Sequence, residues 1–360
     1  MSHSTIKVLR PLLPDAGKIL PYIECIDANR TYSNYGPLNS EFARRLADLV
    51  GGAHATTTSN GTTAIEVALR LRTTKRGGLC LMPAFTFIAS AHAVCNAGLV
   101  PHLLDIDAES LMLTPEIAAE AMMSLAGKVA AVLVVSAYGA PLDLDGWSAF
   151  EDRFGVPVVF DAAAALTSIG RVGSQPVCVS LHATKTLGIG EGGAILTSDG
   201  EFAERAKAMT GFGFAGADRL ASFRSGNYRI SEYAAAVGLA ALDGLPAKLE
   251  QMRDLTLAYA ERIRGKAVSL QAGVGSEWVS MTFNVLADPA EVDATTRRFD
   301  EANVEWRRWW GLGCHRHPAF SDVPRSQLDV TDRTAPRVLG LPFHTDLSTS
   351  DLDRVVACLA

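Results

Sequence analysis

The chain of 360 residues lacks a long hydrophobic run. Its longest purely apolar stretch, Val129–Val135, is far too short to cross a bilayer. The first residues, MSHSTIKVLRPLLP, contain no continuous apolar core of the kind found in signal peptides. These absences predict a soluble, cytoplasmic protein without a membrane partner.

The chain also lacks paired cysteines and an excess of positive charge. Its six cysteines are scattered, with no CxxC pair and no metal-type spacing, as expected of thiols in a reducing compartment. Lys and Arg number 33 against 39 Asp and Glu, giving a net charge of -6, so nothing suggests a nucleic-acid partner. An anionic ligand must therefore be held by local groups. We find no internal repeat and no low-complexity segment.

Apolar strands alternate with amphipathic helices through the middle of the chain. The expected strands are residues 78–83, 100–105, 129–135 and 157–161, and the expected helices are residues 88–97, 115–123 and 144–154. This alternation indicates an α/β fold with a largely parallel sheet that helices cover on both faces. Ligands bind such sheets at the carboxyl ends of the strands, so the residues there are candidates for function.

One such strand end carries a lysine. In VCVSLHATKTLGIGEGGAIL, residues 177–196, a strand containing Ser180 leads to Lys185, and glycines follow at once. A lysine between a strand and a glycine-rich turn is a candidate reactive amine, although a solvated surface lysine is the commoner case for any single lysine. What favours the reactive amine is the set of residues at the other strand ends.

Those residues fit pyridoxal 5'-phosphate when they are taken together. Residues 59–63, SNGTT, join a strand to a helix whose first N–H groups bind anions well, although helix capping by Asn60 or Thr62 explains them equally. Asp161 would keep the pyridine nitrogen protonated, and Phe87 would cover one face of the ring. Lys185 would bond the cofactor's aldehyde covalently.

The C-terminal part lacks the regular alternation of strands and helices and is expected to form a separate domain. We expect a large cofactor-binding domain over residues 1–245, including the N-terminal segment, and a smaller domain over residues 246–360. The long loop at residues 210–229 is typical of a functional loop or a subunit contact. In the small domain we expect a strand at 278–286 and helices at 289–302 and 350–359. His315 and His317 lack a third ligand at suitable spacing, so substrate contact or plain surface is favoured over metal binding.

The chain resembles the DegT/StrS sugar aminotransferases, a branch of the fold-type I aspartate aminotransferase superfamily. The matching segments lie in family order between about residues 30 and 245, with weaker matches (HRHPAF and LPFHTDLS) near the C-terminus. They are NYGPLNSEFARRLADLVG, SNGTTAIEVAL, MPAFTFIASAHAV, the DID of residues 105–107, FDAAAALTS, SLHATKTLGIGEGGAIL and GNYRISEYAAAVGLAAL. The resemblance implies a mostly parallel seven-stranded sheet sandwiched by helices, followed by a smaller α+β domain.

The resemblance also implies roles for individual residues. Lys185 would anchor the cofactor and carry the proton, and Asp161 would pair with the pyridine nitrogen. Phe87 would stack on the ring. The phosphate would be held by Gly61, Thr62 and Ser180 of the same subunit and by Asn227 of a neighbouring subunit, so the site would be shared in a homodimer. Further contacts, with substrate, are assigned to Tyr35, Arg229, His315 and His317.

The implied reaction is transfer of an amino group to a nucleotide-linked keto-deoxysugar, with glutamate as donor, by ping-pong kinetics through pyridoxamine 5'-phosphate. This chemistry belongs to amino-sugar biosynthesis, including that of lipopolysaccharide and other polysaccharides. The chain departs from the family at Ala164, where the family usually has Gln or His beside the cofactor's phenolic oxygen. That departure leaves open a free sugar, a cyclitol or another carbonyl substrate. A regulatory protein that binds the cofactor with little turnover is a further alternative.

Overall fold

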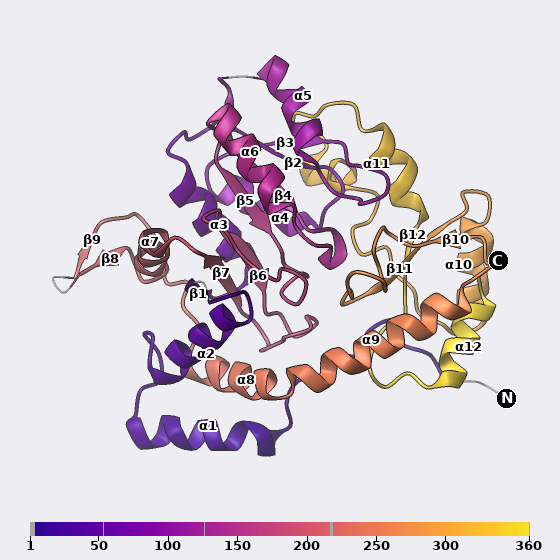
Figure 1. The fold of residues 1–360 in the computed structure, drawn as a ribbon, viewed down its shortest axis with the longest axis horizontal. Helices are drawn as coiled ribbons and strands as arrows, with labels where there is room; N and C mark the ends of the chain where they lie inside the picture. Colours follow the sequence, from indigo (N-terminus) through magenta and orange to yellow (C-terminus); the bar gives the residue numbers. More distant parts are fainter. Residues whose placement is uncertain (1–3, 53, 126, 217–218, 360) are drawn as a thin grey trace.

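The structure is a computed structural model that describes residues 4–52, 54–125, 127–216 and 219–359. A seven-stranded sheet forms the centre of its larger part (Figure 1). In order across the sheet, the strands are β1 (His54–Thr58), β7 (Gly193–Thr197), β6 (Val177–Ser180), β5 (Val158–Asp161), β4 (Val129–Val135), β2 (Leu79–Pro83) and β3 (Val100–Leu104). Within this sheet β7 runs antiparallel to both neighbours, and the other pairs are parallel.

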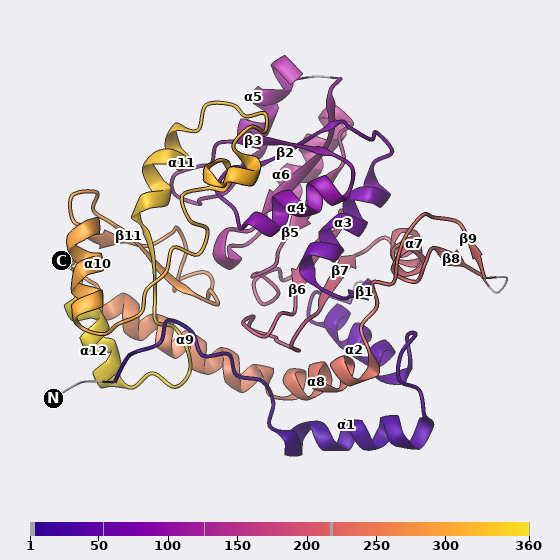
Figure 2. The ribbon, with the colours of Figure 1, turned by 180° about the vertical axis from the view of Figure 1, so that it is seen from behind.

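Helices cover both faces of this sheet, as Figures 1 and 2 show from opposite sides. One face carries α2 (Pro37–Asp48), α5 (Pro115–Leu125), α6 (Leu144–Phe154) and α8 (Glu232–Asp243). The other carries α3 (Gly61–Arg72), α4 (Ile88–Asn96) and α7 (Gly200–Thr210). Strand β4 is buried along its whole length because Val132 and Val134 pack into the first layer, whereas Ala131 and Leu133 pack into the second.

A second core lies in the C-terminal part. It consists of an antiparallel sheet, β10 (Val268–Ser269), β11 (Phe283–Ala287) and β12 (Val338–Leu341), with helices α9 (Leu245–Arg262), α10 (Val292–Glu301) and α12 (Thr349–Ala357). Tyr259 of α9 stacks on Phe283 of β11 with ring centroids 4.6 Å apart. The remaining elements are α1 (Ala16–Asn29), which packs on α8, the hairpin β8 (Phe214–Ala215) and β9 (Leu220–Ala221), α11 (Asp329–Thr334), and four short 3-10 turns, Ala137–Gly139, Cys314–Arg316, Pro318–Phe320 and Ala335–Arg337.

Two segments cross between the two parts of the molecule. The start of the described chain lies with the C-terminal core, because the N–H of Ile6 donates to the carbonyl of Asn303 at 3.0 Å. The sequence prediction groups this segment with the larger domain. Conversely, the N–H of Ser326 donates to Leu103 of β3 at 3.0 Å, which ties part of the C-terminal region to the large sheet.

The predicted α/β architecture is confirmed, and the differences are local. The strand expected at 278–286 is shorter, Phe283–Ala287, because Trp278 closes a turn in which its indole N–H donates to Ala272 at 3.0 Å. Helix α1 was not predicted. The loop at 210–229 contains the β8–β9 hairpin. Among the described residues, no helix is both long and apolar enough to cross a membrane.

Candidate active site

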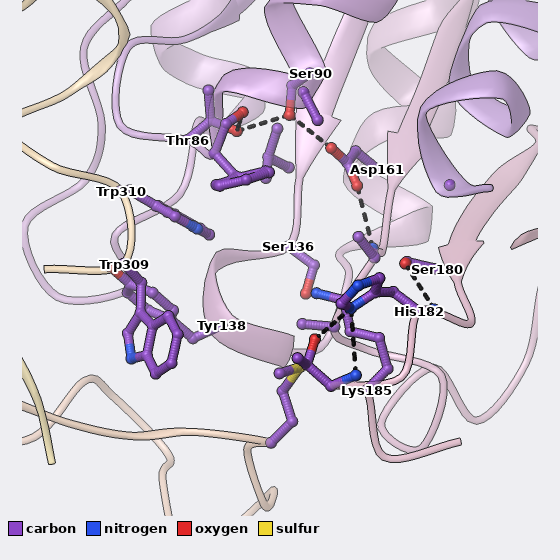
Figure 3. Close-up of a pocket in the computed structure, with 18 of the residues that line it drawn as sticks. Thr86, Ser90, Ser136, Tyr138, Asp161, Ser180, His182, Lys185, Trp309 and Trp310 are labelled. Carbon is purple, nitrogen blue, oxygen red and sulfur yellow. Dashed lines mark hydrogen bonds between the residues drawn. The ribbon is translucent and has the colours of Figure 1, made fainter. Parts of the chain in front are cut away.

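A cavity of about 500 Å³ opens at the carboxyl ends of the parallel strands (Figure 3). The ends of β4, β5 and β6 and the beginnings of α3 and α4 form one side of it. The other side is formed by Leu9, Met281, Thr282, Arg307, Trp309 and Trp310. Lys185, Asp161, Gly61, Thr62, Ser180 and Phe87, which are far apart in the sequence, all line this one cavity.

Asp161 ends strand β5 and is buried, with 5% of its surface exposed. Its carboxylate accepts hydrogen bonds from Ser90 Oγ at 2.6 Å and from the N–H of Ala163 at 3.1 Å. Burial raises the pKa of Asp161, whereas these two hydrogen bonds and the charge of Lys185 act in the opposite direction. The carboxylate is therefore fixed in orientation at the bottom of the cavity.

A second hydroxyl extends this hydrogen-bonded chain. Thr86 Oγ1 lies 2.8 Å from Ser90 Oγ, and both side chains are buried (Figure 3). Sequence reasoning assigned no role to either residue. The spacing in the sequence could have indicated Ser90. It lies three residues after Phe87, so the two side chains are one helical turn apart at the start of α4.

Lys185 lies in the turn after β6. The backbone of this turn is fixed by hydrogen bonds from Lys185 to His182 at 2.8 Å and from Ala183 to Gly190 at 2.7 Å. Gly190 has φ +95°, a conformation that residues with a side chain rarely adopt. Burial lowers the pKa of the Lys185 amine, and the charge of Asp161 opposes this effect. A lowered pKa increases the fraction of neutral, nucleophilic amine.

The beginning of α3 forms an anion cradle. Asn60 caps this helix by accepting the N–H of Thr63 at 2.8 Å, which leaves the N–H groups of Gly61 and Thr62 without intrahelical partners. A Cβ on Gly61 would lie 2.9 Å from Ser180 Cβ, so glycine is required for this close approach. Capping and anion binding, the two interpretations of this motif, are therefore compatible, since different N–H groups serve each.

The opposite side of the cavity is aromatic. The rings of Tyr138 and Trp310 stack with centroids 4.2 Å apart and an interplanar angle of 19°, and Phe85 meets Trp310 edge-on at 5.1 Å. Figure 3 shows Tyr138, Trp309 and Trp310 across the cavity from Asp161, Ser180 and Lys185. Phe87, at the start of α4, remains 55% exposed. Ala164 also lines the cavity, where a larger side chain would occupy space.

The other predicted site residues lie outside the lining of this cavity. Asn227 accepts from Arg229 Nε at 2.9 Å, and the Tyr35 hydroxyl bonds to Lys207 and Thr210 beside them. His315 is buried, with Nε2 2.9 Å from Asp332, and His317 is half-buried in the next turn. Within the part of the chain that the structure describes, no group of His, Cys, Asp and Glu side chains is arranged to hold a metal ion.

The cavity residues fit pyridoxal phosphate. The start of α3 can approach Ser180 this closely only because Gly61 lacks a Cβ, which brings free N–H groups and a hydroxyl together as a phosphate requires. The buried carboxylate of Asp161 suits a protonated ring nitrogen. The amine of Lys185 suits an aldehyde. A mostly parallel seven-stranded sheet with these groups at its strand ends defines the class: an enzyme dependent on pyridoxal phosphate.

Comparison with known proteins gives the family. The chain belongs to the DegT/DnrJ/EryC1/StrS aminotransferase family, whose model matches residues 15–360. It is therefore an aminotransferase with pyridoxal phosphate as its cofactor. A Mycobacterium tuberculosis protein, Rv3402c, is 31% identical over 98% of this chain and 89% of its own. The dTDP-4-amino-4,6-dideoxy-D-glucose transaminase of Shigella dysenteriae is 26% identical over 98% of both chains.

Solved structures agree in fold. A Bacillus cereus protein described as a putative PLP-dependent aminotransferase superimposes with a TM-score of 0.92 at 27% identity, over 99% of both chains. DesI, solved in the presence of its TDP-sugar product, superimposes with a TM-score of 0.90 at 30% identity, over 99% of this chain and 92% of its own. These likenesses extend over both parts of the molecule.

Proposed function

We propose that the protein transfers an amino group from glutamate to a nucleotide-linked keto-deoxysugar, at carbon 3 or carbon 4. The observation that carries this proposal is the single cavity in which Lys185, Asp161 and the cradle at Gly61 meet. Support for the substrate class comes from relatives: DesI is named with a TDP-sugar product, and the Shigella protein is named for a dTDP-linked amino sugar. We place the reaction in amino-sugar biosynthesis for lipopolysaccharide or another polysaccharide, in the cytoplasm.

The residues divide the work as follows. When bound, pyridoxal phosphate supplies an aldehyde that takes up the amino group and a ring that withdraws electrons from the reacting carbon. Gly61, Thr62 and Ser180 hold its phosphate, and Phe87 covers one face of its ring. Asp161, held by Ser90, keeps the ring nitrogen protonated.

Lys185 has two successive tasks. Its Nζ would first hold the cofactor through the aldehyde, until the amine of the donor takes its place. Once free, the same Nζ would take the proton from the donor's α-carbon and act as the proton carrier while the amino group passes to the cofactor. Water would then release 2-oxoglutarate and leave the amino group on the enzyme. Lys185 would move the proton in the opposite direction while the keto-sugar is aminated and water is released. The two half-reactions give ping-pong kinetics.

We further propose a homodimer in which Asn227 reaches the phosphate in the neighbouring subunit, with Arg229 beside it. In support, both residues lie on the long 210–229 segment, outside the cavity of their own chain. Mixing the variants Lys185→Ala and Asn227→Ala tests this arrangement. If the site is shared, mixed dimers contain one intact site and recover activity; if each chain is complete by itself, mixing restores nothing beyond the separate activities.

The experiment that tests the proposed function is an assay of labelled glutamate with a panel of nucleotide keto-sugars. We expect label in one sugar and formation of 2-oxoglutarate. Borohydride treatment of the holoenzyme should fix the chromophore to the peptide containing Lys185. Transfer only to a free sugar or cyclitol would refute the nucleotide-linked substrate, and bound cofactor without turnover on any acceptor would indicate the regulatory alternative.

A further inference from the structure

One cation on the substrate side of the cavity has no role in holding the cofactor. Apart from His182, four acidic or basic side chains line the cavity: Asp161 and Lys185 at the cofactor end, Glu191, and Arg307. Since Lys185 is occupied by the cofactor and two of the others are acidic, Arg307 is the remaining permanent cation among the described residues of the lining.

Arg307 is held in place by its backbone and by an aromatic ring. Its N–H donates to Gly340 of β12 at 3.0 Å, and the N–H of Gly340 donates back to it at 2.8 Å. The guanidinium carbon lies 5.2 Å from the centroid of the Trp309 ring. Trp309 itself packs so closely on Gly340 that a side chain at that position would collide with the indole. The indole of Trp309 thus holds the Arg307 guanidinium in position by a cation–π contact.

Among the described residues, the Arg307 side chain has no hydrogen-bond or ion-pair partner, and its charge acts on Glu305 only at longer range. Its nearest acidic neighbour in sequence, Glu305, already accepts Lys7 Nζ at 2.7 Å and the N–H of Val8 at 3.1 Å. No carboxylate of the described residues forms an ion pair with Arg307, although many other arginines of the chain have one. A planar guanidinium with free donors, stacked on an indole at a ligand cavity, is suited to bidentate binding of a carboxylate.

We propose that Arg307 binds a carboxylate of the amino donor and so selects an α-amino acid as the first substrate. This inference rests on the proposed function and deepens it. The donor's amine must reach Lys185 inside a cavity of about 500 Å³, so its carboxylates must also lie within or at the rim of that cavity. A carboxylate or diphosphate of the sugar substrate is the other source of an anion, and the two half-reactions separate the sources.

The test measures each half-reaction alone, by single-turnover changes in the absorbance of the bound cofactor. With glutamate, Arg307→Gln should lower kcat/KM by ~10- to 100-fold, mainly through weaker binding, because it removes a charge-assisted hydrogen-bonded pair. Arg307→Lys should lose less, since it keeps the charge but not the fork geometry. The half-reaction of the aminated enzyme with the keto-sugar should stay within about threefold of wild type. A loss confined to the sugar half-reaction would overturn the proposal.

A matched control lies one residue away. The guanidinium of Arg308 lies 5.1 Å over Trp306 in a similar stack, but Arg308 does not line the cavity and its Nε donates to Pro336. Arg308→Gln should leave both half-reactions near wild type. Equal losses in the Arg307 and Arg308 variants would indicate a general effect on folding and would contradict a specific carboxylate site.

A binding measurement gives a second, non-catalytic readout. Glutarate carries the two carboxylates of glutamate without an amine, so it binds without reacting. Titration calorimetry on the enzyme loaded with pyridoxamine phosphate should give a dissociation constant that Arg307→Gln raises by ~10-fold or more. An unchanged constant would overturn the inference. The wild-type rate with glutamate tests the proposed function separately: if another amino acid proves to be the donor, the same ratios are measured with that donor and its deaminated analogue.

Discussion

The two ends of the cavity are built in different ways. At the cofactor end, polar groups come from strand ends and a helix start, and the central one, Asp161, is already held by Ser90 and Ala163. At the substrate end, irregular segments carry the aromatic rings of Tyr138, Trp309 and Trp310. There the Tyr138 hydroxyl and the Trp309 indole N–H are buried without a hydrogen-bond partner in the described structure.

This difference suggests that the cofactor end carries out the reaction, whereas the other end determines which substrates bind. Groups fixed before the cofactor arrives need little reorganisation during the reaction, which is how an enzyme stabilises a transition state. An aromatic surface with few fixed polar groups instead selects ligands by their shape. Substitutions at the cofactor end should therefore affect every substrate, whereas those at the substrate end should affect substrates unequally.

The largest expected effect is at Lys185. Lys185→Ala should lower turnover by at least ~10³-fold with every donor and acceptor, because it removes both the anchor and the proton carrier. Steady-state assays measure this loss, and mass spectrometry after borohydride should find no cofactor fixed to the chain. The exposed lysine Lys18, replaced by Ala, serves as the control. Normal turnover in the Lys185 variant would refute the assigned chemistry.

Asp161→Asn should lower turnover by ~10²- to 10³-fold, since the ring nitrogen loses its ionic partner. The cofactor-free protein should respond in the opposite sense. Burial raises the pKa of Asp161, so the ionised carboxylate opposes folding, and this destabilisation grows as pH rises from the unfolded value of about 3.9 through the raised native value. Calorimetry on the cofactor-free variant should show a gain in Tm at neutral pH that shrinks at acidic pH. A gain independent of pH would contradict this explanation.

Ser90→Ala should reduce turnover by about tenfold, because it removes a hydrogen bond to a charged group. The Ser90 hydroxyl lowers the pKa of Asp161, so its removal should shift the acidic limb of the pH–rate profile to higher pH. Thr86→Val, which removes only the second link, should shift this limb less. Loss of activity in Ser90→Ala with an unmoved limb would indicate a purely structural role.

The smallest effect is expected at Ala164. Ala164→Gln introduces the polar side chain that the family usually has beside the cofactor, and should change the visible spectrum of the holoenzyme. The half-reaction with the donor should stay within about threefold of wild type, whereas KM for the preferred acceptor should rise because Ala164 lines the cavity. Equal changes in the kinetics with donor and acceptor would contradict a specific contact between residue 164 and the acceptor.

The fold was predictable wherever burial imposed a clear pattern. The fully buried strand Val129–Val135 and the helix Leu144–Phe154 have the bounds expected from their residues, because each shows a period that its surroundings enforce. Helix α1 has no such signal, since Ile26 is its one fully buried side chain and Pro21 lies inside it. The extra turn at Trp278 shortens β11 through a side-chain hydrogen bond that a strand pattern does not reveal.

The cofactor end of the site was predictable for a related reason. Its residues sit at strand ends, and the topology of a parallel sheet brings strand ends together whatever the loops do. The substrate end depends on contacts between distant segments, such as Trp310 on Tyr138 or Arg307 on Gly340. No local period encodes these contacts. Likewise, His315 is conspicuous in the sequence, yet it is buried against Asp332 rather than lining the cavity.

The first described residues contribute to the site more than their position suggests. Ile6 adds a strand-like pairing to the C-terminal core beside Val304, and Leu9 then reaches the cavity. A shortened gene product that began at residue 15, where the family match begins, would keep every group assigned to the cofactor. It would nevertheless lack Leu9 in the cavity lining and the pairing of Ile6 with Val304 in the smaller core. Truncated variants and amino-terminal fusions should therefore leave this segment intact.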